Sequence, residues 1–260
     1  MRPKILLAGL LALLASPALA DTTATYDADK MPFTAAVADD GNSRIGVEGQ
    51  FELIRRDGVD YIVLTDRAGA PHVARADAAF AAFVARKGAP PENGNWLATP
   101  GAQANVAGYS GTLWQFGPEK DSPLELLMSA DPALAPVGPV FARYAEAVAE
   151  GITVKSPGNA SAVAGVRAVF ANGTPIRVRD LRRPGSTPTR EARTVLELRS
   201  VSKAPIDPHR FDLPGPVLPP DAFFAAIRPP SPANDDVPIQ VENAEPESVR
   251  MPPAPAPRPK

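Results

Sequence analysis

Alternating apolar and polar residues, broken by turn-forming dipeptides, are the feature that most constrains this chain. The stretch GQFELIRRDGVDYIVLTDR, residues 49–67, carries two such runs on either side of Asp57-Gly58. A period of two residues is typical of a half-buried β-strand. Asp40-Gly41 and Asn172-Gly173 are further pairs that tolerate the positive φ of a tight hairpin. The pattern therefore predicts consecutive antiparallel strands, a meander.

Nine segments share this alternation, and each predicts a strand. They are FTAAVAD from Phe33, SRIGVEG from Ser43, QFELIRR from Gln50, VDYIVLT from Val59, GTLWQF from Gly111, PLELLMS from Pro123, VRAVFA from Val166, TPIRVRDL from Thr174 and RTVLELRSVS from Arg193.

Three other segments have helical spacing. Apolar residues recur at three- and four-residue intervals in RADAAFAAFVARKG, where Gly88 can end the helix, and in PVGPVFARYAEAVAEG, where Gly151 can. A third, short helix is predicted for DAFFAAIR from Asp221. Each helix has one apolar side and must lie against another element. The aromatic side chains expected to act as a lid are Phe80, Phe83, Phe141 and Tyr144.

The register of the hairpin at Asp57-Gly58 decides which side chains face the interior. A three-residue loop, with Gly58 as a left-handed bulge, puts Val59, Tyr61 and Val63 on the same face as Phe51. A two-residue loop mixes charges into both faces, so the three-residue loop is the prediction; a slip of one residue would exchange the faces. The expected cavity-lining residues are Phe51, Leu53, Tyr61, Val63, Trp114, Phe116, Leu124, Leu126, Phe170, Leu196 and Leu198.

An antiparallel sheet of this size with one apolar face must curl or be covered. Two medium helices and a short one are too few for a closely packed second layer. The predicted fold is therefore α+β, mainly antiparallel β: a strongly curved sheet, an incomplete barrel, with two or three lid helices. Such a cavity suits an acyl chain, whose burial is worth about 0.8 kcal/mol per methylene. Alternatively, the same side chains pack on one another and leave no void.

Residues 1–20 have the pattern of a secretory signal peptide. Arg2 and Lys4 precede an apolar run, and small residues at 18–20 form a cleavage site. The run is too short to cross a bilayer comfortably, so we expect cleavage and a periplasmic protein of a Gram-negative bacterium. The absence of cysteine excludes disulfides, thiolate metal sites and the lipid-modified cysteine of a lipoprotein.

Composition changes near the C-terminus, where 10 of the 32 prolines fall in residues 229–260. Such a segment cannot bury enough apolar surface to fold, so we expect a disordered tail after a single domain of residues 21–228. Without its leader the chain keeps 25 basic and 29 acidic residues. This balance argues against nucleic acid as a partner.

Several segments occur in an order that points to a family. LIRRDGVDYIVL from Leu53 and NGTPIRV from Asn172 precede TVLELRSVSKAPIDPHRFDLP from Thr194, whose Pro-x-Asp-Pro-x-x-Phe ending forms a closure after the last strand. This order resembles the LolA and LolB family of periplasmic lipoprotein-localisation proteins and their relatives of unassigned role. The resemblance implies a curved sheet with a helical lid around a hydrophobic cavity, and no enzymatic activity. Arg44 is the positional candidate for the arginine that holds the LolA lid through backbone hydrogen bonds.

Catalytic and metal-binding patterns are weak throughout. His72 and His209 lack a second ligand at metal-site spacing, and GYSGT around Ser110 misses the Gly-x-Ser-x-Gly motif. The strand acids Glu52, Glu125 and Glu197 alternate with apolar neighbours, as solvent-facing residues do. We therefore expect no catalytic residues, no metal and no cofactor.

The sequence thus favours a non-enzymatic periplasmic protein that binds a hydrophobic small molecule or an acyl chain, with transient contact to a membrane or an envelope protein. The alternative is an envelope adaptor with a filled core, which acts through its loops or its proline-rich tail.

Overall fold

A single antiparallel sheet dominates the described part of the chain. Its eleven strands are β1 (Thr22–Ala28), β2 (Met31–Val37), β3 (Ser43–Val47), β4 (Phe51–Arg56), β5 (Val59–Thr65), β6 (Pro71–Arg75), β7 (Trp96–Val106), β8 (Tyr109–Pro118), β9 (Leu124–Ser129), β10 (Thr174–Asp180) and β11 (Arg193–Ser202). Their order across the sheet is β6-β5-β4-β3-β2-β1-β11-β10-β9-β8-β7.

The computed structural model describes residues 21–87, 96–118, 124–149, 160–181 and 192–227, all within one compact unit, Met1–Arg228. The expected signal peptide, residues 1–20, and the expected tail, 229–260, lie outside the described residues. The four α-helices of the described residues are α1 (Ala76–Lys87), α2 (Gly138–Ala149), α3 (Ala160–Phe170) and α4 (Pro220–Ile227), and a 3-10 helix, η1, spans Pro208–Phe211.

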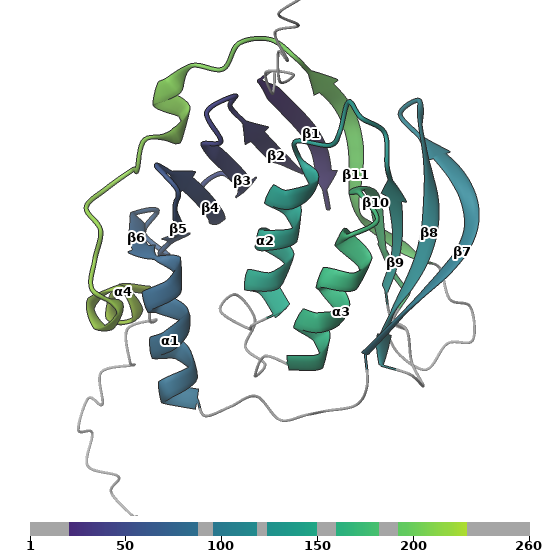
Figure 1. Ribbon diagram of the computed structural model, residues 1–260. Helices are drawn as coiled ribbons and strands as arrows, with labels where there is room; N and C mark the ends of the chain where they lie inside the picture. Colours follow the sequence, from purple (N-terminus) through teal and green to yellow (C-terminus); the bar gives the residue numbers. More distant parts are fainter. Residues whose placement is uncertain (1–20, 88–95, 119–123, 150–159, 182–191, 228–260) are drawn as a thin grey trace, which may run out of the picture. The chain divides into compact units, whose positions relative to one another are not determined.

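The α+β class and the antiparallel meander predicted from sequence are confirmed. Strands β1 to β6 form one meander and β7 to β11 another, and the ladder between β1 and β11 joins them at the centre of the sheet. Strands β6 and β7 are its two free ends, so the sheet is not closed into a barrel. Figure 1 shows the sheet bending around α2 and α3.

We call the face that α2 and α3 cover the inner face, and the opposite face the outer face. Helix α2 packs against β2, β3 and β10, whereas α3 packs against β7 and β8. Helix α1 lies against β5 and β6, next to α4. Together these helices cover the apolar inner face. The sequence predicted α1, α2 and α4 only as a lid, too few for a closely packed layer, because α3 was not recognised as a helix.

Helix α2 follows the predicted apolar stripe. Val137, Val140 and Phe141 are buried, while Tyr144 and Val148 are partly buried against the same core. The spacing of three and four residues puts all five side chains on one side of the helix, where the inner face of the sheet receives them.

One predicted strand is wrong, because VRAVFA belongs to helix α3. The segment before it, ASAVAG, is rich in alanine, and Ala162, Val166 and Val169 are buried at four- and three-residue intervals. This spacing indicates a helix once the whole segment is considered. Three strands were not predicted: β1, β6 and β7.

The predicted three-residue loop at Arg56, Asp57 and Gly58 is also wrong. Arg56 pairs directly with Val59, and Asp57 and Gly58 both have positive φ, 52° and 77°. These are the requirements of a two-residue type I′ turn, for which Asp-Gly is a preferred pair.

This shorter turn exchanges the two faces of β5. Leu53 lies opposite Ile62, so Ile62 and Leu64 face inward. Tyr61 and Val63, predicted to line the cavity, lie on the outer face with Ile54 instead. The charges are mixed into both faces, but they are paired: Arg55 lies 2.9 Å from Asp60 on the inner face, and Arg44 lies 2.7 Å from Glu52 on the outer face.

The segment after β11, residues 203–219, runs along the outer face, and we call it the strap. Phe211 is buried against Ala36 and Ala38, and Leu213 packs against the cluster of Ile54, Val63 and Val73. The Leu218 amide donates a hydrogen bond to the Val73 carbonyl oxygen at 2.8 Å. The strap therefore covers the outer face of β2 to β6 in part, and the free edge of β6.

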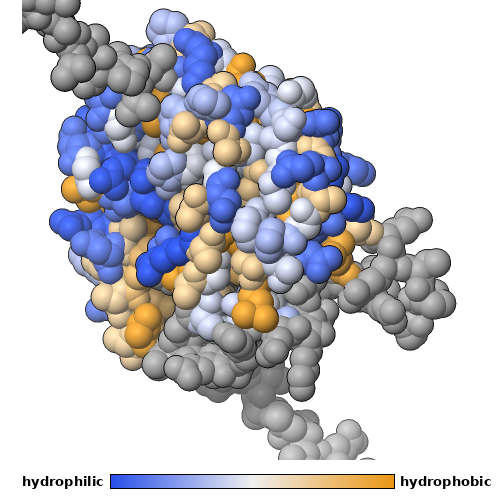
Figure 2. All heavy atoms as spheres, turned by 45° about the vertical axis from the view of Figure 1, so that its right-hand side comes forward, coloured by the Kyte–Doolittle hydropathy of each residue, from blue (hydrophilic) through white to orange (hydrophobic). Residues whose placement is uncertain are grey.

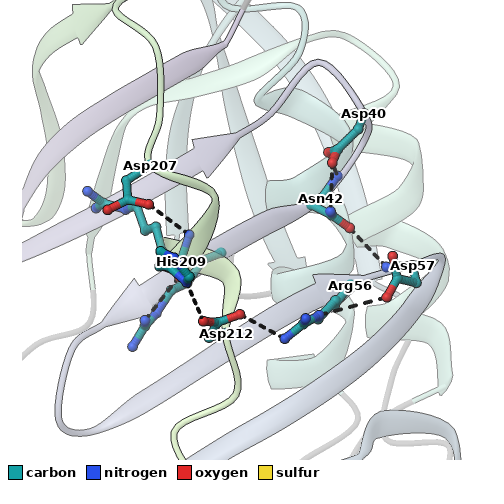
Figure 3. Close-up of polar contacts among 9 residues, drawn as sticks. Asp40, Asn42, Arg56, Asp57, Asp207, His209 and Asp212 are labelled. Carbon is teal, nitrogen blue, oxygen red and sulfur yellow. Dashed lines mark hydrogen bonds and ion pairs between the residues drawn. The ribbon is translucent and has the colours of Figure 1, made fainter.

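Polar contacts fix the strap in place, as Figure 3 shows. Arg56 lies 2.8 Å from Asp212, whose other oxygen lies 2.9 Å from Nδ1 of His209. The hydrogen bond to Asp212 raises the pKa of His209, and the same bond lowers the pKa of Asp212. Arg44 donates to the carbonyl oxygen of Arg210 at 3.2 Å, so the expected lid-holding arginine contacts the strap.

None of the described helices is long and apolar enough to span a membrane.

Gly173, between α3 and β10, offers a test of the close packing between this turn and Ser129 at the end of β9. Its φ is +130°, and a Cβ placed there would lie 2.1 Å from the Ser129 carbonyl oxygen. We expect Gly173→Ala to lower the free energy of unfolding by about 4 kcal/mol, because both the strained backbone and the clash must be accommodated. The measurement is urea unfolding followed by circular dichroism.

Gly41→Ala is the matched control. Gly41 also has positive φ, +86°, but a Cβ there would meet nothing within 4 Å. We therefore expect it to lose only about 1 kcal/mol. Equal losses for the two variants would contradict the close contact between Gly173 and Ser129.

Candidate functional site

The inner face carries most of the predicted cavity-lining residues. Trp114 lies opposite Leu126, and Phe116 opposite Leu124, so these four side chains share a face. Leu196 and Leu198 belong to the same core as Tyr26 and α2. The predicted residues that the structure places under the helices are Phe51, Leu53, Trp114, Phe116, Leu124, Leu126, Leu196 and Leu198, and Phe170 is the last residue of α3 itself.

Aromatic side chains of α2 fill the centre of the inner face. The ring of Phe141 stacks on Phe33 with centroids 5.5 Å apart, and meets the edge of Tyr26 at 5.0 Å. Tyr144 lies 5.1 Å from Phe51. Burial raises the pKa of Tyr144 to about 12. Of the predicted lid residues, Phe141 is thus buried in the core and Tyr144 is partly buried against it.

The other lid residues lie at one side of the sheet. Phe80 of α1 packs against the same core, and Phe83 lies 6.4 Å from Phe224 of α4. Arg86 lies over the ring of Phe224, at 4.8 Å from its centroid. Helices α1 and α4 therefore form a cover of their own over β5 and β6, separate from the cover by α2 and α3.

Helix α3 approaches the sheet closely at a glycine. A Cβ placed at Gly165 would lie 2.6 Å from the ring of Phe116 and 3.6 Å from the Cβ of Trp96. Val166 and Val169 are buried in the cluster that also contains Phe116, Leu126 and Met128. Because Gly165 has no side chain, the sheet's aromatic rings can lie directly beneath the helix.

Three polar atoms on this covered face are buried and have no hydrogen-bond partner within the described residues: the Tyr26 hydroxyl and the indole nitrogens of Trp96 and Trp114. Burial raises the pKa of Tyr26 well above its ordinary value, and the nearby Tyr109 acts in the same direction. Buried polar groups are nearly always hydrogen-bonded, and leaving one unpaired costs about 1 to 3 kcal/mol. All three atoms can donate a hydrogen bond, so they suit a guest that carries acceptor oxygens.

Tyr26 and Trp96 were not among the predicted site residues, because β1 and β7 were not predicted. The alternation in TTATYDA, residues 22–28, could have placed Tyr26 on the same side as Ala24. Trp96 begins β7, whose bulge after Pro100 interrupts the alternation. Proline and glycine at 100–101 made this segment resemble a loop.

Two hollows among the described residues lie at other places. One, of about 520 Å³, is next to the strap and is lined by residues such as Ser202, Ile206 and His209. The other, also about 520 Å³, lies where α3 ends and α2 begins, and Phe170 is among its lining residues. Phe170 also packs against both apolar clusters of the inner face, so this second hollow adjoins the covered region.

The described residues contain no group of three or more His, Asp or Glu side chains placed to hold a metal ion. Each histidine has one carboxylate partner. His209, 86% exposed, lies 2.9 Å from Asp212, and His72 lies 3.0 Å from Asp66. On the face in Figure 2, hydrophilic residues predominate above, and apolar residues gather lower down.

Tyr26→Phe tests the unpaired hydroxyl. If that oxygen is buried without a partner in the free protein, its removal should raise the free energy of unfolding by about 1 kcal/mol. Tyr61→Phe is the matched control, because Tyr61 lies on the outer face and its hydroxyl is not among the buried unpaired atoms; there we expect no gain. A loss of stability in Tyr26→Phe, measured by thermal unfolding, would show that the hydroxyl is already satisfied.

Comparison of the chain with protein-family models, with curated proteins and with solved structures gives no significant match.

Proposed function

We propose that this protein binds a hydrophobic or lipid-like molecule between the inner face of its sheet and helices α2 and α3. In this proposal it acts in the periplasm of a Gram-negative bacterium, after removal of residues 1–20, and does not chemically change its guest. The observation that carries the proposal is the set of buried donors at Tyr26, Trp96 and Trp114, which have no partner among the residues that the structure describes. Their position beneath the helices supports a partner that enters there.

The free energies of burial favour replacement of protein side chains by an acyl chain on the inner face. A guest must displace the rings of Phe141 and Tyr144, whose burial is worth about 1.5 to 3 kcal/mol each. An acyl chain of about sixteen carbons gains up to about 12 kcal/mol when it leaves water completely. The difference leaves room for the ordering of the chain and for movement of α2 together with α3, which packs against it.

The LolA resemblance implies a curved sheet, helices over one face and a hydrophobic cavity between them; the first two correspond to the arrangement described, and the cavity belongs to the proposal. A bent, unclosed antiparallel sheet whose inner face is covered by helices is the architecture expected of a periplasmic carrier of that kind. Family membership is part of the proposal. So is transient contact with a membrane or an envelope protein that delivers or receives the guest.

A second candidate is an envelope adaptor with a permanently filled core. The contacts of Phe141 with Tyr26 and Phe33 favour it, because they already occupy the centre of the inner face. The two functions differ in one requirement: the carrier must let its helices move away from the sheet, whereas the adaptor has no need to.

An engineered disulfide separates them. A Cβ at Gly165 lies 3.6 Å from that of Trp96, within the range that a disulfide spans, and the chain has no other cysteine. The variant Trp96→Cys with Gly165→Cys would therefore tie α3 to β7 when oxidised. The Phe116 ring, 2.6 Å from the new Cβ, must shift in both redox forms, so the comparison is between those two forms. Trp114 remains as the only tryptophan and reports on the covered face.

We expect the reduced variant to bind monooleoylglycerol, with a change in Trp114 emission, and the oxidised variant to bind at least tenfold more weakly. Oxidised and reduced forms of one protein are each other's control. Equal binding by both would place the ligand elsewhere. No binding by the unaltered protein would favour the adaptor, as would recovery of no lipid from the natively purified protein by mass spectrometry.

A further inference from the structure

A group of polar side chains interrupts the apolar inner face beside α2. Ser43, Arg55 and Asp60 lie side by side on β3, β4 and β5, because Ser43 pairs with Arg55 and Arg55 with Asp60. They share the inner face with Leu53 and Ile62, which lie two residues further along the same strands. Arg143 reaches this row from α2. We call these four residues the polar row.

The contacts within the polar row are incomplete. Arg55 lies 2.9 Å from one oxygen of Asp60, and Nε of Arg143 lies 3.6 Å from the other, too far for a hydrogen bond. Arg143 donates a long bond, 3.3 Å, to the Ser43 hydroxyl. Nε of Arg143 and Oδ1 of Asp60 are both buried and have no hydrogen-bond partner within the described residues.

The charges of the polar row do not balance. Two guanidinium groups share the single carboxylate of Asp60. Burial, and then Arg55, lower the pKa of Arg143, whereas Asp60 and Glu146 act in the opposite direction. Glu146 is itself held by Arg167 of α3 at 2.8 Å. The row therefore keeps one positive charge in excess, partly removed from water.

A guanidinium offers a planar set of donors that matches a carboxylate or a phosphate. Tyr144, the residue after Arg143, contacts Phe51 and Phe33 in the region assigned above to the hydrocarbon of the guest. A ligand whose chain lies there would have its polar end next to Arg143. An anion at that point would give Nε of Arg143 the acceptor that it lacks.

We propose that Arg143 and Arg55, with the Ser43 hydroxyl, bind the anionic headgroup, a phosphate or a carboxylate, of an acyl ligand. This inference rests on the proposed function and adds to it the class of ligand: an anionic amphiphile in preference to a neutral one. In the free protein, Asp60 partly takes the place of the headgroup: its carboxylate lies near both Arg55 and Arg143 and holds them in position.

Two probes that differ only in a phosphate test this inference. Oleoyl lysophosphatidic acid and monooleoylglycerol share the same acyl chain, and each is titrated below its micelle concentration with tryptophan emission as the signal. We expect the unaltered protein to bind the phosphate-bearing probe about tenfold more tightly. Arg143→Gln should remove most of this preference while it changes the affinity for monooleoylglycerol less than twofold.

Arg199→Gln is the matched control, because Arg199 is 55% exposed on β11, where its partners are Asp27 and Glu197. It should keep the preference. Arg143→Lys, which keeps the charge but not the planar donors, should retain part of it, and Arg55→Gln should also reduce it. A thermal unfolding curve for each variant establishes that it is folded.

Each outcome has a distinct meaning. Equal binding of both probes by the unaltered protein would overturn the headgroup site and leave the carrier proposal standing. Equal weakening of both probes in Arg143→Gln would overturn it too, by showing that Arg143 only fastens α2 to the sheet. Binding of neither probe would remove the carrier proposal and this inference with it. Competition by millimolar inorganic phosphate as strong as that by the lipid would indicate a site for free anions, unrelated to an acyl chain.

Discussion

The ladder between β1 and β11 is the interaction on which the rest of the structure depends. It joins two meanders that are far apart in sequence, and so turns two small sheets into one with a continuous apolar face. Tyr26 of β1 and Leu198 of β11 lie opposite each other in this ladder, at the centre of that face. A sheet of this width cannot leave such a face in water, so α2 and α3, inserted between β9 and β10, cover it.

The two faces of the sheet are covered in different ways. The strap reaches the outer face directly from β11 and is held by specific polar pairs, such as Arg56 with Asp212 and Arg44 with the Arg210 carbonyl. On the inner face, the main contacts of α2 are rings and aliphatic side chains. Apolar contacts are not directional, so this cover can exchange one apolar partner for another more readily than the strap can.

Much of the fold could be predicted from local pattern, because alternation and helical spacing follow from where each side chain points. Eight strands and helices α1, α2 and α4 were found in this way. The pattern failed where it was ambiguous or hidden: VRAVFA is too short to separate strand from helix, β1 directly follows the signal-like segment, and β7 contains proline.

The turn at Asp57-Gly58 shows a different limit. Its two-residue form brings charges to both faces of the sheet, and this is acceptable only because Arg55 pairs with Asp60 and Arg44 with Glu52. The residues predicted to face inward were assigned from the alternation of side chains along each strand. The wrong turn length therefore misplaced Tyr61 and Val63 on β5, whereas Leu196 and Leu198 on β11 were not affected.

The distribution of unpaired polar atoms separates the two faces further. Of the six buried side-chain atoms without a partner in the described residues, five belong to Tyr26, Asp60, Trp96, Trp114 and Arg143, all on the covered inner face or on α2. The strap side satisfies its polar groups, for instance Glu52 with two hydrogen bonds from Arg44. A permanent core would gain stability by satisfying or losing such atoms, as each costs about 1 to 3 kcal/mol when left unpaired. The proposed guest would explain why they concentrate at the face under α2 and α3, because its polar atoms would supply the missing partners.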